Sequence, residues 1–116
     1  MASNAGLCQR VKLFIDEHFA AIQSVAEIAE KFEVSPARLT RTFRTQYGLG
    51  PKEYLDAIRI REAMKLLEKR RQRFYEIARA VGLKDEDALG KLFKRQGMPA
   101  PTVLRQTNGK SLSADV

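Results

Sequence analysis

The chain has 116 residues, of which 44% are hydrophobic, and a formal charge of +7. This length suits about one domain with a modest core, and no apolar run approaches the roughly 20 residues of a membrane-spanning helix. A single cysteine and a single histidine exclude an internal disulfide and give no basis for a metal site or a catalytic group. We therefore expect neither an enzyme nor a cofactor. Because the N-terminus lacks a secretory signal pattern, we expect a cytoplasmic protein without a membrane partner.

The positive charge is concentrated in the middle of the chain. Residues 35–73 hold 11 Lys/Arg and 4 Asp/Glu, whereas residues 1–34 hold 3 and 5, and residues 74–116 hold 7 and 5. A concentrated basic surface indicates a polyanionic partner, most often nucleic acid. On charge alone, a solvated and solubilising surface is the alternative.

The first subdomain is predicted over residues 6–50, after a disordered N-terminus at residues 1–5. Apolar residues recur at helical spacing over residues 7–21 and predict an amphipathic helix. Ser24 and Glu27 form a capping-box pattern, in which the serine hydroxyl binds the amide of the third helical residue and the glutamate binds the amide of the cap. A short second helix therefore begins after Ser24.

The next helix has Ser35 as its N-cap, Pro36 in its first turn and Gly48 just beyond its end. Two short helices joined by a tight turn form a helix-turn-helix, whose second helix fits the major groove of B-DNA, about 12 Å wide. Leu39 and Phe43 are expected to point inward. The outward residues are candidates for base contact at Ala37, Arg38, Thr40 and Arg41, and for phosphate contact at Ser35, Arg44 and Thr45. Arg41 is the strongest candidate for a bidentate contact to guanine.

Residues 51–70 predict a long linker helix that begins with Pro51. A helix of about 20 residues is about 30 Å long, close to one turn of B-DNA at about 34 Å. One face carries apolar residues, namely Leu55, Ile58, Ala63, Leu66 and Leu67, and charged residues that include Arg59 largely occupy the rest. We interpret this helix as a spacer that holds two DNA-reading units one turn apart.

The helix-turn-helix pattern recurs over residues 71–105. Three residues recur at a shift of 50 positions: Leu39, Phe43 and Pro51 become Leu89, Phe93 and Pro101. This repetition predicts an internal duplication. Gly82 is expected to form the turn and Asp85 to cap a helix over residues 86–96. A last short helix is expected at residues 101–105, and the polar residues 106–116 are predicted to be disordered.

The residues at the DNA-contacting positions of the second unit are less typical of DNA-binding helices. By position, its base-contacting candidates are Glu86, Asp87, Gly90 and Lys91, and its phosphate-contacting candidates are Arg70, Arg71, Arg73, Lys94 and Arg95. Carboxylates repel phosphate but can accept from cytosine, and a glycine supplies no side chain. The second helix therefore either reads bases or supports binding through the DNA backbone.

The sequence thus predicts an all-α fold of about seven helices, with two homeodomain-like helix-turn-helix subdomains joined by a linker helix. The residues resemble the DNA-binding domain of AraC/XylS-type transcription regulators. The matching segments read IAEKFEVSPARLTRTFRTQYGLGP, YLDAIRIREAMKLL, IARAVGL and LGKLFK. Two positions depart from the family pattern: Leu83 replaces an aromatic residue, and Met98 stands where a glycine usually precedes the closing proline.

The resemblance implies a bacterial, nucleoid-associated transcription regulator, for instance an activator, that binds double-stranded DNA with both units on successive major grooves. RNA polymerase is a further candidate partner. Many members also carry an N-terminal sensor or dimerisation domain. The chain is therefore expected to be either a domain excised from such a regulator or a short regulator in itself, monomeric when alone.

Two other functions stay open from the sequence. In one, the chain is a protein-interaction module whose acidic second helix contacts RNA polymerase or a partner domain. In the other, it is an RNA-binding or non-specific architectural protein, with sequence-independent affinity and a steep salt dependence.

Overall fold

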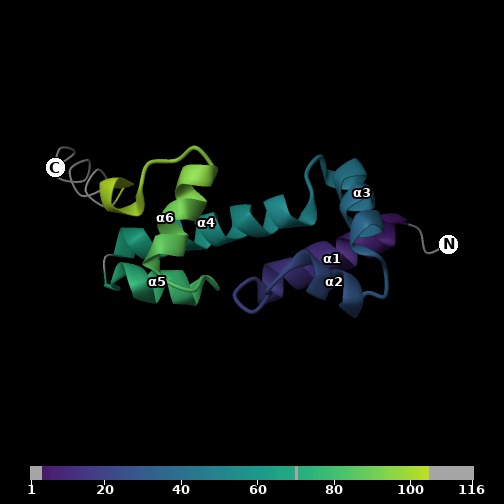
Figure 1. Cartoon of the computed structure of the whole chain (residues 1–116), viewed down its shortest axis with the longest axis horizontal. Coiled ribbons are helices and arrows are strands. Elements are labelled where there is room, and N and C mark those ends of the chain that lie inside the picture. Colours follow the sequence, from purple (N-terminus) through teal and green to yellow (C-terminus); the bar gives the residue numbers. More distant parts are fainter. Residues whose placement is uncertain (1–3, 70, 105–116) are drawn as a thin grey trace. The chain divides into compact units, whose positions relative to one another are not determined.

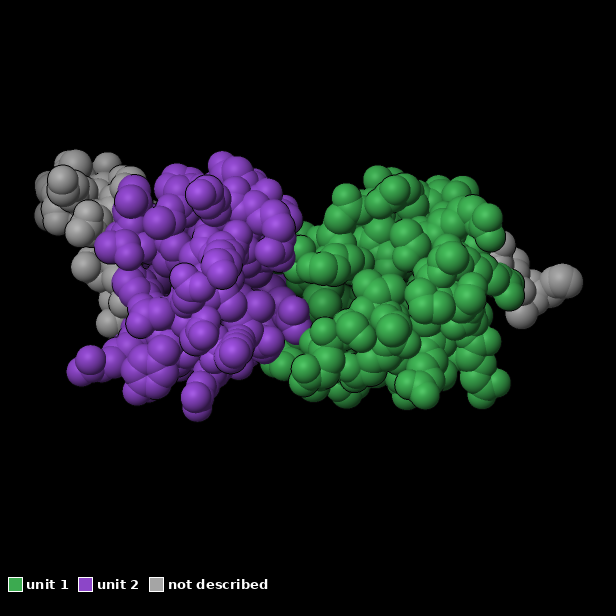
Figure 2. All heavy atoms as spheres, in the orientation of Figure 1, with its two compact units in different colours: residues 1–58 green, residues 59–116 purple. Residues whose placement is uncertain are grey.

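A computed structural model describes residues 4–69 and 71–104 of the chain (Figure 1). Within these residues every regular element is a helix, which confirms the all-α prediction. None of these helices is long and apolar enough to cross a membrane. Residues 1–58 and 59–116 form two compact units, coloured separately in Figure 2. The predicted disordered tail at residues 106–116 and the candidate Arg70 lie outside the described residues.

Unit 1 contains three complete helices and the first part of a fourth: α1 (Asn4–His18), α2 (Val25–Lys31), α3 (Pro36–Tyr47) and α4 (Pro51–Lys69). α3 packs against both α1 and α2. The core consists of buried side chains from all four helices: Leu7, Cys8, Val11, Ile15, Ile22, Ile28, Ala29, Leu39, Phe43, Leu55 and Ile58. Because Leu7 and Cys8 pack in this core, α1 already begins at Asn4, within the segment predicted to be disordered.

α1 ends at His18, three residues before the predicted end at Ala21. The amides of Ala21 and Ile22 both donate to the carbonyl of His18, at 2.9 and 3.2 Å, so the chain turns there. The turn brings Ile22 into the core, where its exposure is only 2%. Burial of this side chain explains why the helix stops early.

Ser24 caps α2 as predicted, because its hydroxyl oxygen accepts from the amide of Glu27 at 3.2 Å. The hydrogen bond that the Glu27 side chain makes back to the start of the helix differs from the prediction. The Glu27 carboxylate accepts from the amide of Gln23, at 2.8 Å, instead of the amide of Ser24. The backbone of Ser24 is extended (φ −164°, ψ 164°), which turns the preceding amide towards the start of the helix.

α4 begins in unit 1 and ends in unit 2, because the boundary between the units follows Ile58. Leu55 and Ile58 belong to the core of unit 1, and Leu67 is buried further along the helix. Arg59, predicted on the charged outer face, is instead buried, with 8% exposure. Its neighbours Ile58 and Ile60 are buried too, so the middle of α4 has no broad polar face.

Unit 2 contains the remainder of α4, together with α5 (Phe74–Ala80), α6 (Glu86–Arg95) and a last helical turn at residues 101–104. α5 packs against α6. Leu89 and Phe93 are fully buried, as are Leu39 and Phe43 at the positions 50 residues earlier. The sequence repeat therefore corresponds to two copies of one packing arrangement.

The turn inside each helix-turn-helix has the same backbone geometry in both copies. Glu33 has φ 57° in unit 1, and Gly82 has φ 92° in unit 2. The amide that follows each of them donates to the preceding helix, to the carbonyl of Ala29 at 3.0 Å and of Ala78 at 2.8 Å. A left-handed residue is therefore required at both turns, and only the second copy has glycine there.

Candidate nucleic-acid interface

Both ends of α3 are fixed by local interactions. The hydroxyl oxygen of Ser35 accepts from the amide of Arg38 at 3.1 Å, and Pro36 occupies the first turn. Gly48 ends the helix in the left-handed conformation, at φ 83°. Leu39, on the inward side, is fully buried. The caps and the buried side therefore determine which residues of α3 face outward.

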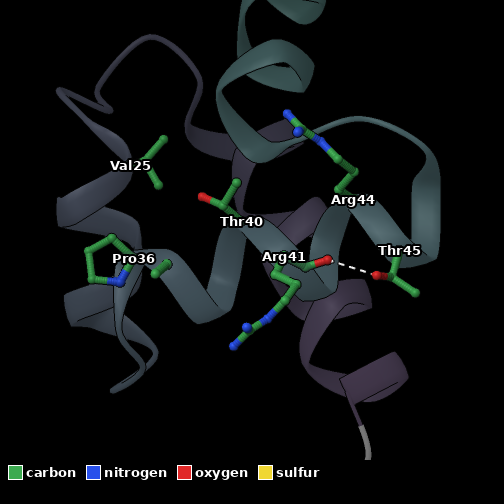
Figure 3. Close-up of a pocket in the computed structure, with 7 residues that line it drawn as sticks. Val25, Pro36, Thr40, Arg41, Arg44 and Thr45 are labelled. Carbon is green, nitrogen blue, oxygen red and sulfur yellow. Dashed lines mark hydrogen bonds between the residues drawn. The ribbon is translucent and has the colours of Figure 1, made fainter.

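The outward face of α3 borders an open concavity of about 730 Å³ (Figure 3). Seven residues from the starts of α2 and α3 and from the outer side of α3 line it: Val25, Pro36, Ala37, Thr40, Arg41, Arg44 and Thr45. Five of the seven DNA contacts predicted on α3 are thus brought together on one surface. The other two, Ser35 and Arg38, are exposed but do not line it.

The two arginines of this surface differ in direction. In Figure 3, the side chains of Arg41 and Arg44 leave α3 in different directions. Thr45 lies beside them, and its hydroxyl donates to the backbone carbonyl of Arg41 at 2.9 Å. A phosphate oxygen only accepts hydrogen bonds, so a phosphate would compete with that carbonyl for the threonine proton. Thr45 is therefore less suited to phosphate than Arg44.

Arg44 makes an ion pair that the sequence did not predict. Its Nη2 lies 2.9 Å from Oε1 of Glu53, a residue in the first turn of α4. The same carboxylate oxygen accepts from the amide of Gly50 at 2.6 Å. The Gly50 amide, and secondly the Arg44 guanidinium, hold the pKa of Glu53 below its ordinary value. Glu53 is thus ionised at neutral pH and connects α3 to α4.

α6 begins as predicted, with the Asp85 side chain accepting from the amide of Ala88 at 2.9 Å. Two of its predicted base-contacting residues pair with each other, since Lys91 Nζ lies 3.2 Å from Asp87 Oδ2. Both side chains are about three-quarters exposed, at 73% and 75%, and an ion pair of this kind is weak. A Cβ added at Gly90 would have no neighbour within 4 Å, so this part of the face is open.

A family model described as a helix-turn-helix domain matches residues 28–107, well over half of the chain. The transcriptional activator RhaS from Citrobacter koseri is 30% identical over 105 residues, which are 90% of this chain and 38% of that protein. The regulator MtrA from Neisseria gonorrhoeae is 36% identical over 77 residues, 66% of this chain and 26% of that protein. This chain belongs to the AraC/XylS-type family. It is a double-stranded DNA-binding domain of the kind found in transcription regulators.

Solved structures of AraC-type domains are similar to this chain. The C-terminal domain of AraT from Geobacillus stearothermophilus has a TM-score of 0.80 at 28% identity, over 86% of this chain and 84% of that one. The C-terminal domain of the response regulator yesN from Fusobacterium nucleatum has a TM-score of 0.78 at 27% identity, over 89% and 99%. The two curated relatives are longer proteins, and this AraC-type chain spans under half of their length.

The other predicted phosphate contacts of this AraC-type domain lie before α5 and at the end of α6. Arg71 and Arg73 are exposed, and the amide of Arg73 donates to Glu76 Oε1 at 2.7 Å to cap α5. Lys94 and Arg95 are exposed in the last turn of α6. Across residues 4–69 and 71–104, the His, Cys, Asp and Glu side chains form no group of three that could hold a metal ion.

Proposed function

We propose that this AraC-type domain binds DNA by placing α3 in the major groove. The observation that carries the proposal is the concavity beside α3, where Ala37, Thr40 and Arg41 adjoin Arg44. Threonine and alanine methyl groups suit contact with thymine, and an arginine can donate two bonds to guanine O6 and N7. These residue types on an exposed helix support direct reading of base edges.

We assign base contact to Arg41 and phosphate contact to Arg44. The two side chains leave the helix in different directions, and the ion pair of Arg44 with Glu53 draws it towards the border between α3 and α4. Arg38 is exposed in the first turn of α3 and is proposed as a further base contact at the edge of the same helix. Thr45 is proposed as a minor phosphate contact, because its hydroxyl already donates to the carbonyl of Arg41. Ser35 is proposed as a phosphate contact at the start of α3, where its hydroxyl oxygen accepts from the Arg38 amide and its proton can be donated.

Two alanine variants test this assignment against duplexes selected from a random library. Arg41→Ala is expected to lose the preference for one base at one position, at a cost of about 1–3 kcal/mol in discrimination. Arg44→Ala is expected to weaken binding to all duplexes alike and to lower the slope of log K against log salt by about 1. If both variants changed the selected sequence equally, or neither did, the division of roles would be refuted.

We infer that α6 contributes mainly through the DNA backbone. Lys94 and Arg95 supply positive charge at its C-terminal end, whereas Glu86 and Asp87 put negative charge at its N-terminal end. Asp87 pairs with Lys91, and Gly90 offers no side chain to a base. Replacing Lys91 by alanine should therefore weaken binding without changing the selected sequence. A changed base preference in this variant would show that α6 reads bases.

We further infer that a regulator containing this chain activates transcription in the cytoplasm, where the bacterial chromosome lies. The name of its relative RhaS as an activator supports this, and the exposed acidic first turn of α6 fits contact with a basic surface of RNA polymerase. The isolated chain is expected to bind as a monomer, with dimerisation supplied by another domain of the regulator. In vitro transcription with Glu86→Ala, which should bind DNA at least as tightly as the unmodified chain but activate less, tests the polymerase contact.

A further inference from the structure

The Glu53 carboxylate accepts two hydrogen bonds at the border between α3 and α4, one from a backbone amide and one from a side chain. Its Oε1 accepts from the Gly50 amide at 2.6 Å and from Arg44 Nη2 at 2.9 Å. A Cβ added at Gly50 would lie 3.2 Å from this oxygen and 3.3 Å from Arg44 Nη2. Glycine at this position therefore leaves the space in which the carboxylate and the guanidinium meet.

The ion pair remains accessible to a ligand from solvent. The side chains of Arg44 and Glu53 are 58% and 55% exposed, and Arg44 also lines the concavity beside α3. A guanidinium carries five N–H donors in a fixed plane, so one bond to Glu53 still allows Arg44 to donate to a phosphate. An arginine already held in one orientation loses less conformational freedom on binding than a mobile one.

We propose that Glu53 positions Arg44 for a DNA phosphate and so strengthens DNA binding, although Glu53 itself is negatively charged. This inference rests on the phosphate contact proposed above for Arg44. Coulomb's law alone gives the opposite sign, because removal of a carboxylate near DNA reduces repulsion from the phosphates. The sign of the effect therefore distinguishes a positioning residue from an ordinary surface anion.

The test compares Glu53→Ala with Glu30→Ala, which removes the same charge from the exposed surface of α2 in the same unit. Affinity is measured on a mixed-sequence duplex of about 30 bp, roughly three helical turns, at several salt concentrations. Glu53→Ala is expected to bind about two- to tenfold more weakly than the unmodified chain, whereas Glu30→Ala should bind equally well or slightly better. If Glu53→Ala bound as tightly as Glu30→Ala, the proposal would be overturned.

A double-mutant cycle separates positioning from a loss of helix structure, since Glu53 also caps the start of α4. In an Arg44→Ala background, Glu53→Ala is expected to cause no further loss of affinity. An equal loss in both backgrounds would overturn the proposal, because Glu53 would then act through the helix start. Where Glu53→Ala does not fold, Glu53→Gln carries the same test. It keeps an acceptor oxygen and is expected to lose about twofold in affinity, and a gain would refute positioning.

The single variant Arg44→Ala distinguishes this inference from the function that underlies it. If Arg44→Ala bound DNA as well as the unmodified chain, the proposed phosphate contact would fail and the positioning role with it. If Arg44→Ala weakened binding while Glu53→Ala did not, only the positioning role would fail.

Discussion

Replacing Glu33 by glycine should stabilise unit 1. Among the residues that the structure describes, Glu33 is the one non-glycine residue with a positive φ, at 57°. It occupies the turn between α2 and α3, and the equivalent turn in unit 2 has Gly82 at φ 92°. A glycine at residue 33 would remove the steric cost of the left-handed conformation and keep the backbone bond that closes the turn.

The size of the gain follows from two opposing contributions. A left-handed conformation costs an ordinary L-residue about 1–2 kcal/mol. Glycine in turn loses about 0.5–1 kcal/mol more than alanine through backbone entropy on folding. At the middle of both ranges, the net increase in unfolding free energy is therefore about 0.75 kcal/mol. With an m-value of about 1.5 kcal/mol/M, the urea midpoint should rise by about 0.5 M, measured by far-UV circular dichroism.

Gly82→Ala is the matched control, because it makes the opposite change in the other copy of the same turn. Its urea midpoint should fall by a similar amount, as alanine meets the left-handed cost that glycine avoids. A lower midpoint for Glu33→Gly, or shifts of the same sign in both variants, would refute the claim that the two turns are equivalent.

Other substitutions and a pH titration test the remaining fold. Gly90→Ala should raise the unfolding free energy by about 0.8–1.0 kcal/mol, because the new Cβ meets no atom within 4 Å and alanine favours the helix; a destabilised variant would contradict this. Phe43→Ala should lower it by about 3–5 kcal/mol in denaturant unfolding, since the ring is fully buried; a loss below about 1 kcal/mol would contradict its place in the core. Glu53 and Glu62 have lowered pKa values, through the Gly50 amide and the Lys65 side chain respectively. The stability they contribute is present above the unfolded-state pKa of about 4.3 and should be lost as the pH falls through the lower folded-state values. Replacing both by glutamine should make acid unfolding less steep.

The N-caps of α2, α3 and α6 could be predicted because capping depends on residues close to each other in the chain. Ser35 and Asp85 form the bonds expected of them, as does the hydroxyl of Ser24. The end of α1 could not be predicted in this way. It depends on the burial of Ile22 in the core, and the position of Ile22 there is determined by how the helices pack.

Interactions between helices were the part of the site that the sequence did not reveal. The bond between Arg44 and Glu53 spans nine positions and depends on the angle at which α4 leaves α3. The burial of Arg59 depends in the same way on what surrounds the middle of α4. The pair of Asp87 with Lys91 was not predicted either, although its i,i+4 spacing is that of helix neighbours and could have indicated it.

The proposed contact of Arg41 with a guanine in the major groove can be tested by replacing a single acceptor atom of the DNA, the N7 nitrogen of guanine, with C–H. A selected duplex is prepared with 7-deazaguanine in place of guanine at each position in turn, and its affinity is measured with the unmodified chain and with Arg41→Ala. If Arg41 donates to N7, there is one position at which loss of N7 weakens binding of the unmodified chain by at most about 1–3 kcal/mol and has no effect on binding of Arg41→Ala. Equal losses for both proteins at every position would contradict it.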